Sequence, residues 1–250
     1  MENYTATDRI LAIDIGGSHV KTILLDAEGN PLEERRRTDT PKPAGPEAII
    51  NIIKDLANQT GAFTKAAAGF PGFIKNDIIQ TAPNLGTQLW LGTNLSKKLE
   101  EVLGKPVIVV NDADFQGAGL VSGKGFEIVI TLGTGFGTAL LKDGVLLPHL
   151  EISQHPITKT KNYDSYIGAK AYEQLGKKKW NLRLQKVLSI LKTVFNYDHL
   201  YISGGNAEYI NFKPEGNITL DTNTEGFKGA AKLWAVVGKG IENLELGIWN

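Results

Sequence analysis

Short apolar runs and glycine turns alternate at the start of the chain. Residues 9–15 contain a nearly continuous apolar run that predicts a buried strand, and residues 19–25 predict a second strand after a pair of glycines. Turn-forming residues follow at 26–31, and residues 32–37 predict a third strand. The chain is therefore predicted to open with a β-meander rather than an immediate βα unit.

Apolar residues with helical spacing predict the helices. Within residues 47–59, isoleucines and a leucine recur at positions 49, 52, 53 and 56, on one face of a helix. Asn94 is placed to cap a helix over residues 96–103. Further helices are predicted at residues 164–176, at 181–195 and from about Gly226. Further strands are predicted at residues 65–70, 107–110, 127–131, 138–141 and 199–203.

The order of strand, glycine turn and strand occurs again in the middle of the chain, around residues 133–137. This repetition predicts two lobes of similar topology. We expect residues 1–111 to form a smaller N-terminal lobe, joined by a C-terminal helix at about 236–250. Residues 112–235 are expected to form a larger C-terminal lobe.

Composition and charge exclude several classes of protein. Of the 250 residues, 42% are hydrophobic, which is enough for a large core, and 27 basic residues balance 27 acidic ones. A neutral chain has no net field that would hold nucleic acid, so a phosphate ligand has to be bound locally. Without cysteine, the chain has no disulfide, thiol nucleophile or zinc-thiolate site.

Membrane and secretion signals are missing from the sequence. No apolar run reaches the roughly 20 residues that cross a bilayer, and the first residues lack the pattern of a signal peptide. We therefore expect a cytoplasmic protein with no membrane partner. The one dense basic stretch, residues 177–179, is typical of a solvated helix junction, although it would also suit a polyanionic ligand.

Two glycine turns are candidate phosphate sites, because backbone N–H groups can approach an anion where no side chain intervenes. The turns contain Gly16, Gly17 and Ser18, and Gly133, Thr134 and Gly135. Asp14 precedes the first turn, and a carboxylate beside phosphates implies a divalent cation between them. We expect Asp14 to contact the water shell of Mg²⁺, or alternatively to hydrogen-bond its own turn.

A polar pair follows the apolar strand predicted at residues 107–110. Asp112 lies where a segment of small residues begins, and a carboxylate there can accept the proton of a sugar hydroxyl. The neighbouring amide of Asn111 can hold another hydroxyl. Phosphoryl transfer to a small sugar, with Asp112 as general base, follows from this interpretation. Alternatively, Asp112 only caps the helix.

Five ordered motifs resemble those of ROK sugar kinases, and in particular the polyphosphate glucokinase-like branch of that family. They are Ile13-Asp14-Ile15-Gly16-Gly17-Ser18, then Gly69-Phe70-Pro71-Gly72-Phe73-Ile74 with Thr81-Ala82-Pro83-Asn84-Leu85, then Asn111-Asp112-Ala113-Asp114, then Thr131-Leu132-Gly133-Thr134-Gly135-Phe136-Gly137, and Ile202-Ser203-Gly204-Gly205. The likeness extends over nearly the whole chain.

The resemblance implies an α/β, actin-like ATPase (ribonuclease H-like) fold, with two lobes and a central cleft in which sugar and donor meet. It implies a hexokinase or glucokinase that uses Mg²⁺ with ATP or polyphosphate, most specifically for glucose 6-phosphorylation. A homodimer is common in the family.

The same resemblance assigns roles to individual residues. Asp112 matches the catalytic base and Asn111 a sugar ligand. The two glycine turns match the phosphate loops, and Gly204 and Gly205 match the pair beside the adenosine of the nucleotide. Asn84 falls in the sugar-side loop.

Departures from the family pattern concern the sugar. The family usually carries Glu-x-Gly-His, a cysteine-rich zinc loop and Leu-Glu-x-Tyr. We align Glu151 and Asp164 with the two glutamates, which places Gln154 at the histidine with His155 beside it. A competing alignment places His149 at the histidine. The step from 151 to 164 leaves no room for the zinc loop, so no zinc is expected.

Glu151, His155 and Asp164 are therefore the expected sugar ligands, and the identity of the sugar stays open. A non-catalytic sugar-binding sensor or regulator of the same fold is the alternative hypothesis. Some ROK proteins are repressors with a DNA-binding domain, but only about eight residues precede the first predicted strand, so no helix-turn-helix is expected. Retention of Asp112 and both glycine turns favours catalysis over sensing, and the sugar-side residues disfavour a third hypothesis, an ATPase acting on proteins.

Overall fold

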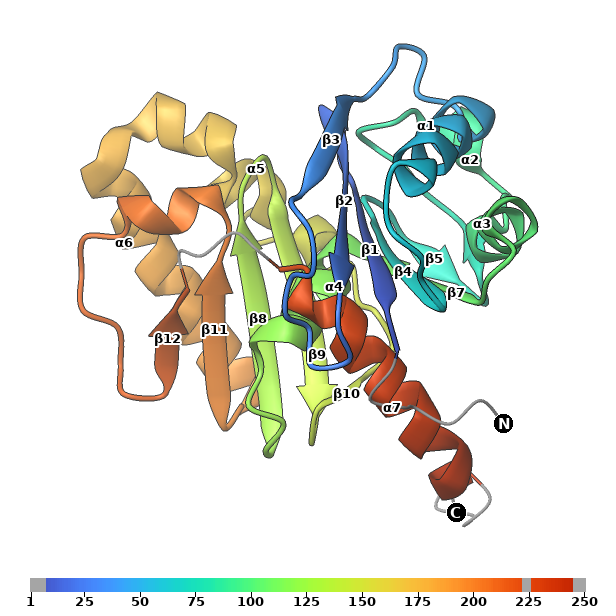
Figure 1. The fold of residues 1–250 in the computed structure, drawn as a ribbon. Coiled ribbons are helices and arrows are strands. Elements are labelled where there is room, and N and C mark those ends of the chain that lie inside the picture. The colour runs from blue at the N-terminus through green and yellow to red at the C-terminus, as the bar shows by residue number, and fades with distance from the viewer. Residues whose placement is uncertain (1–7, 222–225, 245–250) are drawn as a thin grey trace. The chain divides into compact units, whose positions relative to one another are not determined.

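A computed structural model describes residues 8–221 and 226–244 and divides the chain into two compact units (Figure 1). The first unit comprises Met1–Gly119 and Phe227–Asn250, and the second comprises Leu120–Gly226. The sequence placed these boundaries near residues 111 and 236 and made the first lobe the smaller one. The structure differs because helix α4 (Asp112–Leu120) continues directly from the first sheet and helix α7 (Lys228–Leu244) packs on it. The last part of the predicted C-terminal helix, residues 245–250, lies outside the described residues.

The first unit is built on a five-stranded sheet with the order β3-β2-β1-β4-β7. Its strands are β1 (Ile10–Ile15), β2 (His19–Leu25), β3 (Arg36–Asp39), β4 (Lys65–Phe70) and β7 (Val107–Asn111). The predicted meander is confirmed, since β2 is antiparallel to both β1 and β3. Strands β4 and β7 join in parallel, so β1, β4 and β7 end at the same edge of the sheet.

The third strand begins later than the sequence predicted. Residues 32–37 were expected to be extended, whereas β3 covers Arg36–Asp39. The carboxylate of Glu33 accepts hydrogen bonds from Gly61 N at 2.8 Å and from the Arg36 guanidinium at 2.8 Å, which holds the preceding residues in an irregular bend. Because β3 is a mostly exposed edge strand, it has no apolar alternation that would mark its bounds.

Three helices cover one face of this sheet: α1 (Pro46–Asn58), α2 (Thr87–Trp90) and α3 (Leu95–Leu103). A small hairpin of β5 (Ile74–Lys75) and β6 (Ile78–Ile79) also belongs to this unit. The buried indole of Trp90 donates to Ala44 O at 2.7 Å, which satisfies its one polar atom inside the core. The predicted cap is confirmed, since the Asn94 side chain accepts a hydrogen bond from Lys97 N at 2.9 Å.

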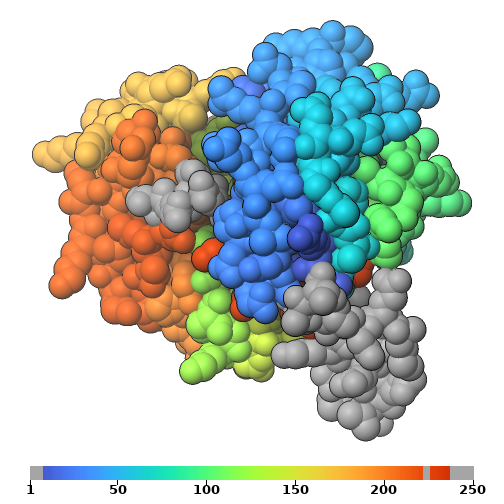
Figure 2. Space-filling view, viewed as in Figure 1, coloured from blue at the N-terminus to red at the C-terminus, as the bar shows by residue number. Residues whose placement is uncertain are grey.

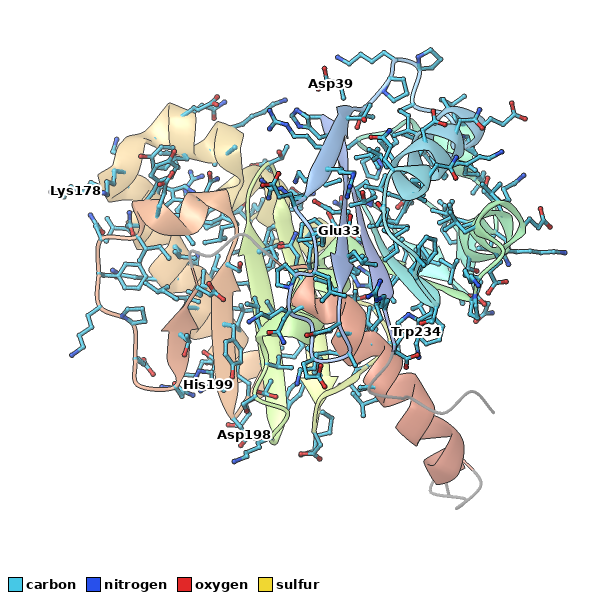
Figure 3. The ribbon with its side chains drawn as sticks, in the orientation of Figure 1. Glu33, Asp39, Lys178, Asp198, His199 and Trp234 are labelled. Atoms are coloured by element: carbon cyan, nitrogen blue, oxygen red, sulfur yellow. The ribbon has the colours of Figure 1, made fainter. Side chains whose placement is uncertain are left out.

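Helices α4 and α7 belong to the same unit and approach each other closely at glycines. A Cβ at Gly119 would lie 2.7 Å from Gly229 N, so neither helix could carry a side chain there. Trp234 on α7, labelled in Figure 3, donates to Ala66 O of β4 at 3.0 Å. Its ring also lies under the Lys65 ammonium, which pairs with the Asp8 carboxylate at 2.7 Å. These contacts attach the C-terminal helix to the first sheet.

The second unit repeats this topology in a sheet with the order β10-β9-β8-β11-β12. Its strands are β8 (Phe126–Leu132), β9 (Phe136–Lys142), β10 (Val145–Leu146), β11 (His199–Ser203) and β12 (Ile218–Leu220). As in the first sheet, an antiparallel hairpin, β8 with β9, is followed by a parallel partner, β11. The predicted similarity of the two halves is therefore confirmed at the level of strand order.

Helices α5 (Tyr163–Ile167) and α6 (Ala169–Phe195) cover one face of the second sheet, with the short 3-10 segments η1 (Ile152–Gln154) and η2 (Gly205–Tyr209) beside them. Gly176 interrupts α6 with a φ of 70°, so the two predicted helices meet at a kink. The lysines at 177–179 directly follow it and are exposed, as predicted for a solvated junction. Helix α6 forms an outer surface of this unit, gold to orange in Figure 2, and Lys178 points outward in Figure 3. Among the helices of the described residues, none has the length and apolar character needed to cross a membrane.

Removal of the α3 cap should measurably weaken the first unit. Asn94→Ala removes the acceptor for Lys97 N, and we expect a loss of about 1 kcal/mol in the free energy of unfolding. The matched control is Asn51→Ala, since Asn51 is exposed inside α1 and alanine is the better helix former there. Denaturant unfolding followed by circular dichroism would test this, and equal effects of the two changes would contradict the capping role.

Candidate functional site

The carboxyl edge of the first sheet brings several predicted residues together. Asp14 pairs with Gly69 across β1 and β4, and Phe70 pairs with Asn111 across β4 and β7. The first glycine turn, the loop after Phe70 and the start of α4 therefore share one edge. Ligands of open α/β sheets bind at this kind of edge, which makes it the candidate site of the first unit.

The first glycine turn is held by its neighbours and partly exposed. Thr40 donates through its hydroxyl to Gly16 O at 2.6 Å and through its backbone to Ser18 O at 2.9 Å. A Cβ at Gly17 would lie 3.2 Å from Cβ of Asn84, so Asn84 lies directly against the turn. The structure thus brings together two segments that lie far apart in the sequence. The contacts of Thr40 with the turn were not predicted, because no local sequence pattern indicates them.

Asp14 forms an ion pair with Lys21, with 2.9 Å between carboxylate and ammonium. The sequence analysis did not identify Lys21 as a partner of Asp14. The two residues lie directly opposite each other in the β1–β2 hairpin, and the short turn between the strands could have indicated this register. Both side chains are about a quarter to a third exposed. Within residues 8–221 and 226–244, no group of three or more His, Asp or Glu side chains could hold a metal ion by itself.

Asn111 and Asp112 lie at the junction of β7 and α4. The buried Asn111 side chain donates to Gly72 O at 3.1 Å and accepts from Ala113 N at 2.8 Å, so it joins the loop after β4 to the start of the helix. The carboxylate of Asp112 also accepts from Ala113 N, at 2.9 Å, and is only half-buried. Asn111 therefore shares with Asp112 the capping of the α4 N-terminus, the structural role that the sequence analysis considered for Asp112 alone.

The carboxyl edge of the second sheet carries the second glycine turn and the Gly204-Gly205 pair. Thr131 and Ser203 are paired across β8 and β11, directly before these two segments. Gly204 has a φ of 91° and lies so close to Leu132 O that a Cβ would clash. Asn206, which the sequence did not indicate, donates to Gly133 O at 3.0 Å and connects the two segments.

A polar cluster around Glu151 lies in the same unit. The ring of His149 is 11% exposed and lies 3.4 Å from the Glu151 carboxylate, which also accepts from the Ser153 hydroxyl at 3.0 Å. The hydrogen bond from His149 lowers the pKa of Glu151 in spite of its burial. His149 thus joins the site through Glu151, a role that the preferred alignment had not given it.

Asp164 and Gln154 form the other side of this cluster. Gln154 donates to Asp164 at 3.2 Å and accepts from the Asn162 amide at 3.2 Å. Burial raises the pKa of Asp164, and the nearby Glu151 charge adds to this, while a hydrogen bond from Phe136 N opposes it. His155 is exposed, and its ring lies 6.4 Å from that of Tyr163 between centroids. The structure therefore brings Glu151, Gln154 and Asp164 together and places His155 at their margin.

Removal of the His149 ring should raise the pKa of Glu151. In His149→Ala the carboxylate loses its largest stabilising contact, so the desolvation cost is no longer offset. Because the unfolded pKa is unchanged, the ionised Glu151 should no longer stabilise the folded state above that pKa, so the variant should lose less stability than the wild type on acidification through this range. Titration of the ¹³C-labelled glutamate carboxyl by NMR measures the shift, with His155→Ala as the control. An unchanged Glu151 titration in His149→Ala would refute the pairing.

Comparisons with known proteins identify the family of this chain. The sequence model of the ROK family matches residues 10–148, more than half of the chain. The polyphosphate glucokinase of Mycobacterium leprae (strain TN) is 29% identical over 212 residues, which cover 80% of this chain and 64% of that protein. The chain thus spans slightly less than two thirds of the length of that relative.

Solved structures are similar over nearly the whole chain. The inorganic polyphosphate/ATP-glucomannokinase of Arthrobacter sp. strain KM is 28% identical, with a TM-score of 0.81 and coverage of 92% of this chain and 99% of that one. A ROK family glucokinase from Streptomyces griseus, solved with glucose and AMPPNP, is 18% identical, with a TM-score of 0.74 and coverage of 91% and 98%. The expected α/β, actin-like ATPase fold is confirmed by these similarities.

Proposed function

Since the chain belongs to the ROK family, we propose that it is a sugar kinase that transfers a phosphoryl group from ATP or polyphosphate to a hexose hydroxyl. The specific reaction that we propose is phosphorylation of glucose at its 6-hydroxyl. The observation that carries the proposal is the position of Asp112 at the same sheet edge as the first glycine turn, so that an acid–base group and a phosphate-binding turn belong to one surface.

Asp112 is the proposed general base. Phosphoryl transfer needs little covalent assistance, so an enzyme contributes mainly by orienting the nucleophile and removing its proton. A half-buried carboxylate at the first residue of α4 is accessible to a hydroxyl. Its hydrogen bond from Ala113 N, at 2.9 Å, holds one carboxylate oxygen in place.

The two glycine turns are the proposed sites for donor phosphates. Mg²⁺ keeps most of its water shell and needs only one or two protein carboxylates in addition to phosphates, so the single Asp14 suits it. When bound, Mg²⁺ neutralises charge on the transferred group. Asp14 would hold a water of that ion, with Lys21 beside it as its ion-pair partner. Gly204 and Gly205 would lie beside the adenosine when ATP is the donor.

Sugar ligands are proposed for each unit by itself. Glu151 is the proposed principal ligand, because its carboxylate is more exposed than the His149 ring beside it and each of its oxygens, which lie against His149 and Ser153, has a further lone pair for a hydroxyl. Asn84 and Asn111 are the proposed amide ligands, although two hydrogen bonds of the Asn111 side chain are already used within the protein. His155 would contact the sugar from its exposed position.

The decisive experiment is a phosphorylation assay with separate donors. The purified protein would be incubated with Mg²⁺ and glucose, mannose, fructose or N-acetyl sugars, with either ATP or polyphosphate, and sugar phosphate would be quantified. We expect product from the wild type and a loss of kcat of about a hundredfold or more in Asp112→Asn, with a smaller change in the KM for sugar. This loss follows because the amide is nearly isosteric but cannot accept the proton.

The matched control is Asp55→Asn, an identical change at an exposed position of α1 that should leave kcat unaltered. Full activity of Asp112→Asn would refute its role as base. If the wild type bound sugar but formed no product with either donor, the sensor hypothesis would replace the kinase.

A further inference from the structure

The second glycine turn is bound by a carboxylate that the sequence had assigned to the sugar. Oδ1 of Asp164 accepts a hydrogen bond at 2.7 Å from the backbone N–H of Phe136, the first residue after the turn. Oδ2 accepts from the Gln154 side chain at 3.2 Å. Each oxygen of Asp164 therefore already has a protein donor.

The turn and the segment that carries Asp164 are in close contact. A Cβ at Gly135 would lie 2.7 Å from Oδ1 of Asp164, and a Cβ at Gly168 would lie 2.6 Å from Thr134 O. Ala169 N donates to Gly133 O at 3.0 Å. A Cβ at Gly168 would meet backbone, so glycine is required there, whereas a Cβ at Gly135 would meet the Asp164 carboxylate and displace it. The turn therefore lies against α5 and the start of α6.

A carboxylate is well suited to this role. A hydrogen bond to an ionised acceptor is stronger than one between neutral groups, and a backbone donor cannot rotate away. Burial and the neighbouring Glu151 charge both disfavour the ionised form of Asp164, and the Phe136 N–H is the main contact that opposes them. The charge of Asp164 is therefore directed at the backbone of the turn.

We propose that Asp164 is a positioning residue for the phosphoryl donor, which orders the turn at residues 133–136 for phosphate binding rather than acting as a ligand of the sugar. This inference rests on the proposed kinase function and changes the role of one residue within it. An anion site made of backbone N–H groups gains affinity when the turn is ordered before the ligand arrives, because less conformational entropy is then lost on binding.

The test separates donor affinity from sugar affinity in three variants. Asp164→Ala removes the acceptor, Asp164→Asn keeps a neutral oxygen that can still accept from Phe136 N, and Gly135→Ala forces the carboxylate away. The KM for MgATP and for polyphosphate would be measured at saturating glucose. Direct binding of each donor and of glucose would be measured by calorimetry.

We expect Asp164→Ala and Gly135→Ala to raise the donor KM and Kd about tenfold, the effect of losing one charge-assisted hydrogen bond, with glucose Kd changed less than about twofold. Asp164→Asn should recover much of the lost donor affinity. The stacking of Phe136 on Tyr163, at 5.3 Å between ring centroids, still holds α5 in the variants, so a folded protein is expected.

The chain provides a matched control at the other end of the same hairpin. Asp198 accepts from Phe126 N at 2.6 Å, and a Cβ at Gly125 would clash with its carboxylate, just as at Gly135. Asp198 and the neighbouring His199 are labelled at the lower end of β11 in Figure 3. Asp198→Ala removes the same kind of bond and should leave both donor and glucose affinity within about twofold of the wild type.

A raised glucose Kd in Asp164→Ala with unchanged donor binding would overturn the inference and restore the sugar-ligand role. Equal losses of donor affinity in Asp164→Ala and Asp198→Ala would also overturn it, since the effect would then be general destabilisation. Failure of the kinase proposal is recognised separately, by a wild type that forms no sugar phosphate, and the calorimetric comparison of donor binding applies in that case too.

Discussion

Parallel strand pairing is the constraint on which the candidate chemistry depends. In the first sheet, β1, β4 and β7 run in the same direction, so the segments that follow them emerge at one edge. In the second sheet, β8 and β11 do the same. Residues that lie tens of positions apart, such as Gly17 and Asn84, meet for this reason. A change of register by one residue would turn these side chains to the opposite face and dismantle the edge.

Carboxylates that accept hydrogen bonds from backbone N–H groups are a second recurring feature of the described residues. Glu127 is fully buried and accepts hydrogen bonds from Ser122, Gly123, Lys124 and Tyr201. Asp164 and Asp198 each bind the N–H at the first residue of a strand, β9 and β8 respectively. A buried carboxylate is costly unless its oxygens are satisfied, and backbone donors of a tight turn satisfy them without flexible side chains. These acidic residues therefore organise loops as well as offering charge for chemistry.

The polar cluster around Glu151 illustrates the difference between what a family motif predicts and what a structure shows. The alignment placed Glu151, Gln154 and Asp164 in one family motif, and the structure brings these three residues into one cluster. It did not reveal that His149 pairs with Glu151, or that Asp164 binds the turn before β9. Sequence similarity identifies equivalent positions. It does not show which donors a side chain reaches, because this depends on the length of the side chain, as at Asp164, where the family has a glutamate.

The sequence by itself determined the family, the fold class and most of the elements. Strands such as β2, β4 and β11 were predicted with their observed bounds, because apolar periodicity and glycine turns are local properties of the chain. The predicted range of the exposed strand β3 was wrong by several residues. Its polar residues carry no such signal, and the contact of Glu33 that precedes its start is made with the distant Gly61.

Only the tertiary structure decided which polar groups meet. The pairs Asp14 with Lys21, Asn206 with Gly133 and Asp164 with Phe136 depend on strand register and on how helices pack against the sheets. It also assigned α4 and α7 to the first unit, since this choice depends on the approach of Gly119 to Gly229 and on the bond from Trp234 to β4. Local sequence specifies the conformation of each segment, but the partners of its side chains are set by contacts between segments that lie far apart in the chain.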